Sequence, residues 1–144
     1  MSIITLILLR RLKKLFDWKK PTVQMLGRWQ PWHDGHQELF KRAVEKTGQV
    51  IIQVRDVHGA SGGDGQEDNP FDWDSVCENI SLGLKKDGFI RGEQYEIMMV
   101  PNIVNITYGR GVGYVFEEEV FDSSITEISA TKIRKQMREE GDLE

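Results

Sequence analysis

The stretch Val50-Ile51-Ile52-Gln53-Val54 decides the fold class of this chain. A compact run rich in β-branched residues is typical of a strand buried in a parallel sheet. Residues 22–26 predict a shorter strand before it, which ends at Gly27. Between these two runs, residues 35–47 carry an apolar stripe with the spacing of a helix face. The folded part of the chain therefore opens with a strand, a helix and a strand.

The alternation of strand and helix continues toward the end of the sequence. A loop with four glycines (58–65) precedes a helix at 72–86, a strand at 95–100, a weaker strand at 125–128 and a polar helix at 130–140. Such an order implies right-handed crossovers between parallel strands. We expect a single α/β domain with a Rossmann-like parallel sheet and helices on both faces. The residues that follow the strands should meet at the carboxyl edge of the sheet, where such sheets bind ligands.

Length and composition are typical of one soluble domain. The 144 residues suit a single core, and 39% apolar with 29% charged residues argue against disorder. The single cysteine, Cys77, excludes an intramolecular disulfide, and a four-ligand zinc site would depend on the three histidines. A composition with a single cysteine and no possible intramolecular disulfide is typical of a reducing compartment, and we expect the protein in the cytoplasm.

Charge is distributed unevenly along the chain, whose net charge is −4. Residues 1–20 hold six basic side chains against Asp17 alone, whereas residues 21–144 hold 13 basic and 22 acidic side chains. The acidic body argues against nucleic-acid binding, which needs a basic footprint. Pro21 marks the boundary between a basic N-terminal segment (1–20) and the domain (21–144), because proline pushes the preceding residue out of the helical region.

The N-terminal segment begins with an apolar run at residues 3–9, and its apolar residues recur at the spacing of an amphipathic helix. The run is too short to span a bilayer alone. Its positive charges follow the apolar run, whereas those of a secretory signal precede it. Three interpretations stay open: a helix packed on the body or on a second subunit, a peripheral membrane anchor, and a disordered tail. The first interpretation includes a homo-oligomer.

Residues 27–36 (Gly-Arg-Trp-Gln-Pro-Trp-His-Asp-Gly-His) stand where a phosphate site is expected, between the first strand and the first helix. A helix N-terminus offers unpaired N–H groups and the positive end of the helix dipole, which favour an anion. The imidazoles of His33 and His36 could add N–H donors beside it. Two alternatives stay open for the pair: ordinary surface histidines on a turn, and, with Asp34, ligands of a transition metal.

Residues 128–134 (Ile-Ser-Ala-Thr-Lys-Ile-Arg) run from the last predicted strand into the last predicted helix. Ser129 is a good N-cap, and Thr131 and Arg134 lie in or near the first turn. Because the guanidinium fork suits bidentate phosphate contacts, this is a second candidate anion site at a helix N-terminus. The alternative is a plain capped surface helix.

Taken together, the two elements resemble the hallmarks of the nucleotidyltransferase superfamily, which contains nicotinamide-mononucleotide adenylyltransferases, phosphopantetheine adenylyltransferases and small cytidylyltransferases. Residues 33–36 match its (His/Thr)-x-Gly-His element, and residues 128–134 match its Ile-Ser-Ser-Thr-x-Ile-Arg element, with Ala130 replacing the second serine. Residues 27–33 are similar to the Gly-Arg-Phe-Gln-Pro-Phe-His form of the nicotinamide-mononucleotide branch. Residues 69–71 (Asn-Pro-Phe) are similar to the start of that branch's second helix. The resemblance covers about residues 22–140.

The resemblance implies a reaction in which a phosphate oxygen of a small acceptor, such as nicotinamide mononucleotide, attacks the α-phosphate of ATP, and pyrophosphate leaves with Mg²⁺. By this resemblance, the catalytic residues are His33, His36 and Arg134, and the nucleotide-binding residues are Gly27, Arg28, Gly35, Ser129 and Thr131. No metal ligand is implied among the protein's own residues. A cytidylyltransferase acting on a small phosphomonoester and a nucleotide-binding regulatory module without turnover stay open as alternatives.

Four residues are candidates for binding the acceptor, in regions that depart from the nicotinamide-mononucleotide branch or lie beside the expected site. Arg55 and Asp56 end the second predicted strand, Trp73 could stack on a base or a nicotinamide ring, and Arg110 lies in the glycine-rich run 108–114. Each has a plainer interpretation. In these plainer interpretations, Arg55 and Asp56 would pair with each other, Trp73 would be half-buried packing, and Arg110 would belong to a tight turn between two strands.

Overall fold

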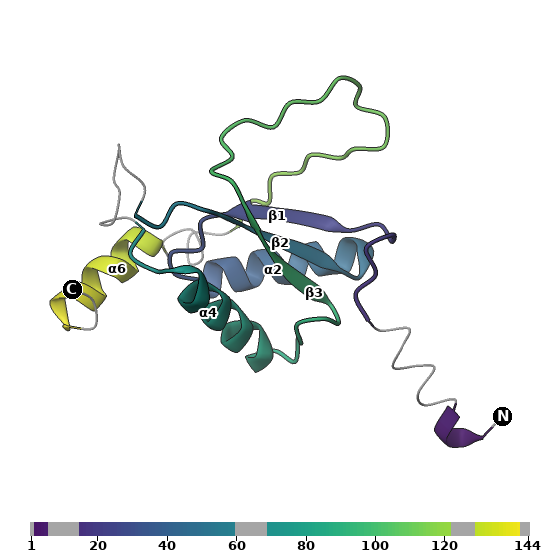
Figure 1. Ribbon diagram of the computed structural model, residues 1–144, viewed down its shortest axis with the longest axis horizontal. Coiled ribbons are helices and arrows are strands. Elements are labelled where there is room, and N and C mark those ends of the chain that lie inside the picture. Colours follow the sequence, from purple (N-terminus) through teal and green to yellow (C-terminus); the bar gives the residue numbers. More distant parts are fainter. Residues whose placement is uncertain (1, 6–14, 60–68, 122–128, 142–144) are drawn as a thin grey trace.

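The computed structural model describes residues 2–5, 15–59, 69–121 and 129–141. Its centre is a sheet of three parallel strands in the order β1-β2-β3 (Figure 1). The strands are β1 (Val23–Gly27), β2 (Val50–Arg55) and β3 (Tyr95–Val100). The predicted strands at 22–26, 50–54 and 95–100 are confirmed, and so is a single α/β domain of Rossmann-like type. Because the strands are parallel, their carboxyl ends lie together at the same end of the sheet.

Three longer helices accompany the sheet within the described residues: α2 (Asp34–Thr47), α4 (Trp73–Lys86) and α6 (Ala130–Glu139). α2 ends at Gly48, whose φ of 89° is in the left-handed region that glycine adopts without steric penalty. α4 begins after Asp72, whose carboxylate accepts a hydrogen bond from Ser75 N (2.9 Å). The helices predicted at 35–47, 72–86 and 130–140 are thereby confirmed.

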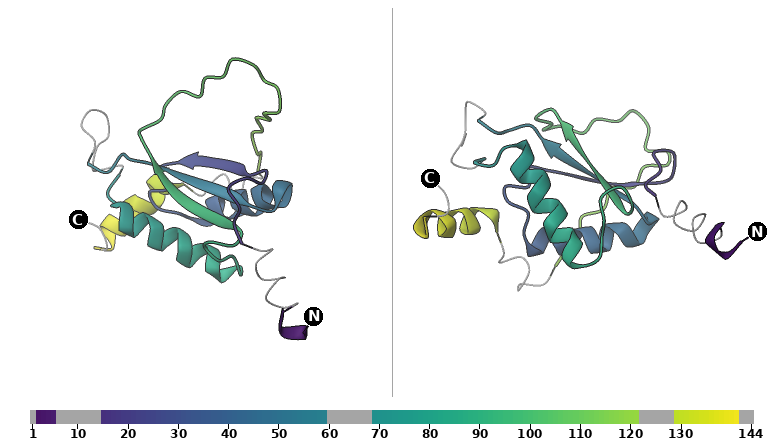
Figure 2. Two further views of the ribbon diagram at one scale, coloured as in Figure 1. Left: turned by 45° about the vertical axis from the view of Figure 1, so that its right-hand side comes forward. Right: turned by 60° about the horizontal axis from the view of Figure 1, so that its bottom comes forward.

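The core lies between one face of the sheet and the helices α2 and α4. Buried and half-buried residues alternate along β2, so that Val50, Ile52 and Val54 belong to the core cluster. Phe40 of α2 and Ile80 of α4 are fully buried in the same cluster. Right-handed crossovers that advance in one direction place their helices on the same face, which explains this arrangement. Helices on both faces were expected, and within the described residues α2 and α4 cover one face (Figure 2).

The opposite face of the sheet carries polar and partly exposed side chains. Gln24 Nε2 donates to Gln53 Oε1 there, and Met98 of β3 is 36% exposed. The strand predicted at 125–128 lies outside the described residues, as does most of the predicted N-terminal helix. Over the parts of the chain that the structure describes, no helix is long and apolar enough to cross a membrane.

Residues 101–121 follow β3 as an extended arm that contains neither helix nor strand and stands clear of the sheet (Figures 1 and 2). The rings of Tyr108 and Phe116 stack between its two limbs, with centroids 5.1 Å apart. The returning limb is bound to α2, because Glu119 pairs with Arg42 (3.3 Å) and Lys46 (2.6 Å). The interpretation of residues 108–114 as a turn between two strands is wrong, since no strand flanks them within the described arm.

Candidate active site

The two histidines after β1 cap the N-terminus of α2 reciprocally. His33 is the N-cap, and its Nδ1 accepts hydrogen bonds from the backbone N–H groups of Gly35 (3.0 Å) and His36 (3.3 Å). His36 stands at the third helical position, and its Nδ1 accepts from the backbone N–H of His33 (3.3 Å). The pair therefore forms a capping box in which imidazoles replace the usual hydroxyl and carboxylate.

These hydrogen bonds assign the same tautomer to both imidazoles. A ring nitrogen that accepts a hydrogen bond carries no proton, so each neutral ring has its proton on Nε2. The rings are stacked, with centroids 3.6 Å apart and planes inclined by 16°. The cap thus uses the Nδ1 atoms of His33 and His36 and leaves both Nε2–H groups as donors for a ligand.

Burial keeps these two histidines neutral. Burial and the neighbouring His33 together lower the pKa of His36 to about 3. Burial also lowers the pKa of His33, and Asp34 and a backbone hydrogen bond partly oppose that shift. At neutral pH the pair therefore offers N–H donors without a formal charge. The positive potential at this place comes from the start of α2.

Trp29 positions His36 and explains the glycine at residue 27. Trp29 has a φ of 55°, and its Nε1 donates to the carbonyl oxygen of Gln53 (3.0 Å). Its ring meets His36 edge-on, with centroids 4.8 Å apart. A Cβ on Gly27 would lie 2.8 Å from Trp29 Cζ2, so a larger residue there would displace the indole. Gly27 is required by this packing, and the expected contact of its backbone with a nucleotide stays a prediction.

The loop after β1 is tied to the segment that opens α4. Gln30 Nε2 donates to the carbonyl oxygen of Phe71 (2.9 Å), and Gln30 Oε1 accepts from Phe71 N (2.8 Å). Arg28 Nη1 donates to Asn69 Oδ1 (3.2 Å) beside this pair. The resemblance singled out both sequence runs, but it assigned no role to Gln30 or Asn69. The contacts show that the two runs form one unit.

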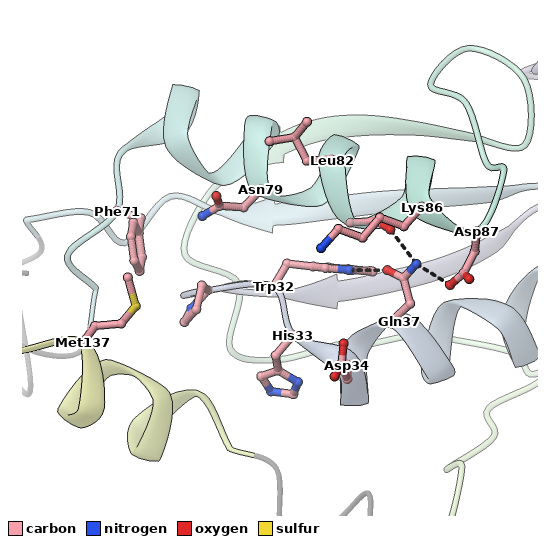
Figure 3. A pocket seen from close by; sticks show the side chains of 12 residues that line it. Trp32, His33, Asp34, Gln37, Phe71, Asn79, Leu82, Lys86, Asp87 and Met137 are labelled. Atoms are coloured by element: carbon pink, nitrogen blue, oxygen red, sulfur yellow. Dashed lines mark hydrogen bonds between the residues drawn. The ribbon is translucent and has the colours of Figure 1, made fainter. Parts of the chain in front are cut away.

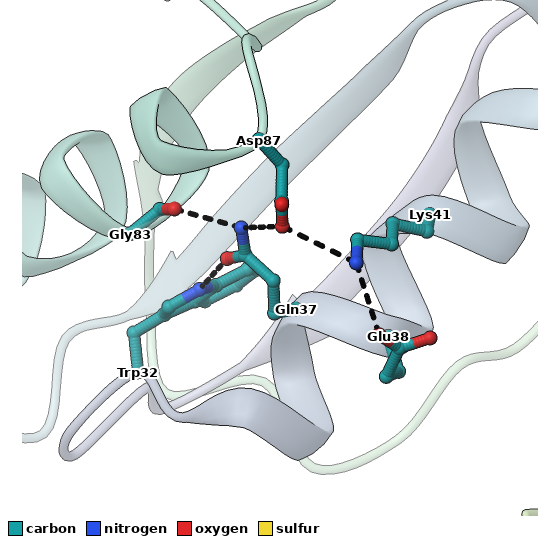
Figure 4. A network of polar contacts seen from close by, with 6 residues as sticks. All are labelled: Trp32, Gln37, Glu38, Lys41, Gly83 and Asp87. Carbon is teal, nitrogen blue, oxygen red and sulfur yellow. Dashed lines mark hydrogen bonds and ion pairs between the residues drawn. The ribbon is translucent and has the colours of Figure 1, made fainter.

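Gln37 holds the second tryptophan of the loop. Its Oε1 accepts from Trp32 Nε1 (2.8 Å), and its Nε2 donates to the Gly83 carbonyl and the Asp87 carboxylate, both at 2.7 Å (Figure 4). The Trp32 ring lies 5.5 Å from the ring of His36. Gln37 therefore joins the start of α2 to the end of α4 and fixes an aromatic wall beside His36. Sequence reasoning missed this residue, because a glutamine near a helix start reads as a surface position.

Two cavities border the histidine pair on different sides. The smaller, of about 330 Å³, is lined by Leu26, Gly27, Arg28, Trp29, Gln30, His36, Leu39 and Arg134. The larger, of about 530 Å³, lies between the start of α2, α4 and α6, and His33, Asp34 and Met137 are among its lining residues (Figure 3). The structure thus gathers four of the predicted residues at the smaller cavity: Gly27, Arg28, His36 and Arg134.

Arg134 connects the second motif to the first. Its side chain is 1% exposed, and its Nη1 donates to the carbonyl oxygen of Gln30, 104 residues away in the sequence. Ser129 is the N-cap of α6, as predicted, and its Oγ accepts from Lys132 N (3.1 Å). Thr131 lies in the first turn of the same helix. The Ser129 hydroxyl therefore serves the helix cap, and the second motif reaches the smaller cavity through Arg134.

Of the four acceptor candidates, Arg55 and Asp56 are consecutive where β2 ends, whereas Trp73 and Arg110 belong to other segments; none of the four lines either cavity. Arg55 Nη2 donates to Asn102 Oδ1 (2.6 Å), and within the described residues it forms no ion pair with Asp56. Trp73 opens α4 and packs against the edge of the core, which agrees with the packing interpretation. Arg110 is exposed on the arm. Their proposed contact with an acceptor stays a prediction.

Comparison with known proteins gives one distant relative. No protein-family profile matches the chain. A nicotinamide-nucleotide adenylyltransferase of Methanococcus aeolicus is 26% identical to it in a comparison that covers 78% of this chain and 75% of that protein. The chain is thus similar to a nucleotidyltransferase across most of its length. At this level of identity, the similarity does not identify the substrate.

Proposed function

We propose that this protein is a nucleotidyltransferase that moves AMP from ATP onto a small phosphorylated acceptor and releases pyrophosphate. The observation that carries the proposal is the reciprocal cap of His33 and His36, which leaves two Nε2–H donors at a helix N-terminus. The cavity beside His36 adds the side chains of Arg28 and Arg134. The neutral donor of His36 and these two guanidinium groups line the smaller cavity, and His33 borders the larger one. Such groups suit a triphosphate.

In the proposed reaction, an acceptor phosphate oxygen attacks the α-phosphorus in line, and the bond from that phosphorus to the bridging oxygen of pyrophosphate breaks. Negative charge grows on the departing pyrophosphate. The Nε2–H groups of His33 and His36 hold oxygens of the α-phosphate, and Arg134 stabilises the leaving group. Because neither imidazole needs to gain or lose a proton, catalysis rests on positioning and on charge stabilisation.

Mg²⁺ enters this proposal as part of the substrate, the magnesium complex of the nucleoside triphosphate. In the described ranges, no group of three or more His, Cys, Asp or Glu side chains is placed to hold a metal ion. Phosphate oxygens are ligands that Mg²⁺ prefers, and the ion usually keeps several waters. The residues around the cavity would bind the triphosphate part of the complex.

ATP and nicotinamide mononucleotide are proposed as substrates because the chain is similar to proteins of one branch. The relative from Methanococcus aeolicus is a nicotinamide-nucleotide adenylyltransferase, and residues 27–33 are similar to the form found in that branch. A cytidylyltransferase acting on a small phosphomonoester would use the same donors with another base and acceptor. A regulatory module would bind the nucleotide without turnover. The experiment below separates these three functions.

The test is pyrophosphate release with Mg²⁺ across a grid of nucleotides and acceptors. ATP, CTP, GTP and UTP are each combined with nicotinamide mononucleotide, phosphopantetheine, glycerol 3-phosphate, phosphocholine or no acceptor. We expect the signal with ATP and nicotinamide mononucleotide. His36→Ala should lower this rate by about 100-fold or more, as expected for loss of a charge-stabilising donor.

A matched variant separates catalysis from folding. His36→Gln keeps an acceptor for the backbone N–H of His33, as glutamine does in ordinary capping boxes, but it removes the imidazole. A rate that falls in His36→Gln while the unfolding midpoint is kept supports the assigned role. A signal with CTP would replace the adenylyl assignment. Nucleotide binding by thermal shift with no pyrophosphate from any pair would favour the regulatory module.

A further inference from the structure

The arm formed by residues 101–121 exposes an unusual amount of apolar surface. Eight of its apolar side chains are between 55% and 83% exposed: Val104, Ile106, Tyr108, Val112, Tyr114, Val115, Phe116 and Val120. At up to about 200 Å² for each side chain, together they expose on the order of 1,000 Å². Patches larger than a few hundred Å² on a monomer usually mark an interaction site. The arm therefore has the surface of one side of an interface.

The arm has a defined position on the body because both of its ends are anchored. At its start, Asn102 Oδ1 accepts from Arg55 Nη2 (2.6 Å). At its end, Arg42 Nη1 donates to the carbonyl oxygen of Val120 (2.9 Å), and its guanidinium lies 4.1 Å from the centre of the Phe121 ring. Between the anchors, the figures show the arm standing clear of the sheet (Figures 1 and 2). Its apolar side chains are thus presented to a partner and not to the core of their own chain.

The first limb of the arm has the pattern of a strand without a partner. Val104, Ile106 and Tyr108 alternate with the polar residues Asn105 and Thr107. This is the pattern of a half-buried strand. The described residues place no strand beside this limb. A limb of this kind pairs readily with an exposed sheet edge.

The same chain offers such an edge. In the order β1-β2-β3, the strand β3 is an outer strand of the described sheet. Met98 and Met99 lie on opposite faces of β3 and are 36% and 44% exposed. An uncovered edge with apolar side chains is a template for pairing with another chain. The arm and the β3 edge are therefore two unpartnered surfaces of matching kind.

We propose that the first limb of the arm packs along the β3 edge of a second copy of this chain, so that two arms are exchanged around a two-fold axis. An isologous contact of this kind uses both surfaces and closes on itself. Each copy gives both a limb and a β3 edge to such a contact, so each kind of surface is buried twice in the dimer. The inference does not depend on the proposed enzymatic activity.

Charge also favours a second copy as the occupant. Arg110 is the only basic residue of the arm. If the limb runs antiparallel to the partner's strand, Arg110 falls near the start of β3, where Glu93 and Glu96 lie. A membrane or a nucleic acid would instead favour a basic surface, and residues 101–121 carry three glutamates against this one arginine.

The first test is the molar mass of the full chain in solution, measured by light scattering across a wide range of protein concentration. We expect a dimer, and we expect the double variant Val104→Asp/Ile106→Asp to be a monomer with an unchanged circular dichroism spectrum. Asn105→Asp is the matched control, because it adds charge to the same limb without removing apolar surface, and it should stay dimeric. A wild-type monomer throughout, or a double variant that remains a dimer, would overturn the proposal.

Cysteine pairing gives a second test that does not depend on the stability of the aspartate variants. In a Cys77→Ser background, Val104→Cys and Met99→Cys are made in separate chains, mixed and oxidised mildly. We expect a disulfide-linked pair containing one chain of each kind. Val104→Cys mixed with Leu82→Cys is the control, since Leu82 is exposed on α4. Absence of the first product, or equal yields of both, would contradict the assigned contact.

Discussion

The side-chain amide of Gln30 forms two hydrogen bonds with the backbone of Phe71, at 2.8 and 2.9 Å. It satisfies both polar groups of that residue in the way a neighbouring strand would. Gln30 itself is 4% exposed, and its own carbonyl oxygen accepts from Arg134. One residue of the loop after β1 therefore binds the segment before α4 through its side chain and α6 through its backbone. The candidate site depends on this junction, because three segments far apart in the sequence meet there.

Replacing Gln30 should therefore destabilise the protein strongly. Gln30→Met keeps the length of the side chain but leaves the partly buried N–H and carbonyl groups of Phe71 without the amide partner. Each unsatisfied group costs about 1–3 kcal/mol, so we expect the free energy of unfolding in urea to fall by roughly 2–4 kcal/mol. Gln24→Met, on the exposed face of the sheet, is the control and should change it by less than about 0.5 kcal/mol. Equal effects of both variants would contradict the assigned role of Gln30.

The two roles of His33 can be separated by a pair of substitutions. His33→Ala removes the N-cap of α2, which should lower the stability by about 1 kcal/mol. His33→Asn supplies a preferred N-cap side chain and should keep most of that stability. Both variants lack the Nε2–H donor, so both should lose pyrophosphate release to a similar extent. Retention of full activity in His33→Asn would show that the imidazole acts only as a cap.

The free energy of unfolding should depend on pH because burial keeps His33 and His36 neutral in the folded protein. The pKa of His36 is lowered to about 3 in the folded protein, whereas an unfolded histidine titrates near pH 6.5. As the pH falls below about 6.5, His36 becomes protonated in the unfolded chain but stays neutral in the folded protein. Stability should therefore fall with pH, by up to about 1.4 kcal/mol per pH unit for this group. Above about pH 6.5 its contribution should be constant.

Urea unfolding between about pH 7 and pH 5 measures this effect, above the range in which carboxylates titrate. His36→Gln should flatten the slope in that window, because it removes the group whose pKa is lowered by burial. His33, whose pKa is also lowered by burial, adds to the slope in the same direction. The interpretation fails if His36→Gln keeps the full slope.

The elements and the first motif could be predicted from local pattern. The β-branched run of β2 and the apolar stripe of α2 identify themselves through periodicity, and a glycine followed by two histidines at a helix start predicts an anion site. Gln30 and Gln37 give no such signal. Their partners Phe71 and Gly83 lie 41 and 46 residues away, and only the tertiary fold brings them together. Pattern reasoning therefore singled out the candidate site, but it did not identify the side chains that hold its shape.

For the arm, the sequence predicted strands that the structure does not contain over residues 101–121. The interpretation of a turn between two strands rested on the glycine-rich run 108–114. A strand needs a neighbour to take its backbone hydrogen bonds, and within the described residues the arm has none. Local propensity cannot supply that neighbour. The four acceptor candidates were chosen by local arguments as well, and none of them lines either cavity beside the histidines.

Gly83 gives a further prediction, because its position reverses the usual effect of a helical glycine. Replacing a glycine in an exposed helix interior by alanine normally stabilises a protein by about 1 kcal/mol. At Gly83 a Cβ would lie 2.9 Å from Trp32 Cδ1, and Trp32 cannot move freely, since Gln37 holds its Nε1 at 2.8 Å. We expect Gly83→Ala to lower the free energy of unfolding by roughly 1–3 kcal/mol through overpacking.

Gly83→Ala should also disturb the candidate site, because the ring of Trp32 that it displaces lies 5.5 Å from the ring of His36. A double-mutant cycle in urea checks the mechanism. In a Trp32→Phe background the smaller ring leaves room for the methyl group, so Gly83→Ala should cost less there than in the wild type. If the penalty is the same in both backgrounds, the clash with Trp32 is not its cause. If it shrinks, weaker nucleotide binding by Gly83→Ala alone follows from the displaced aromatic wall.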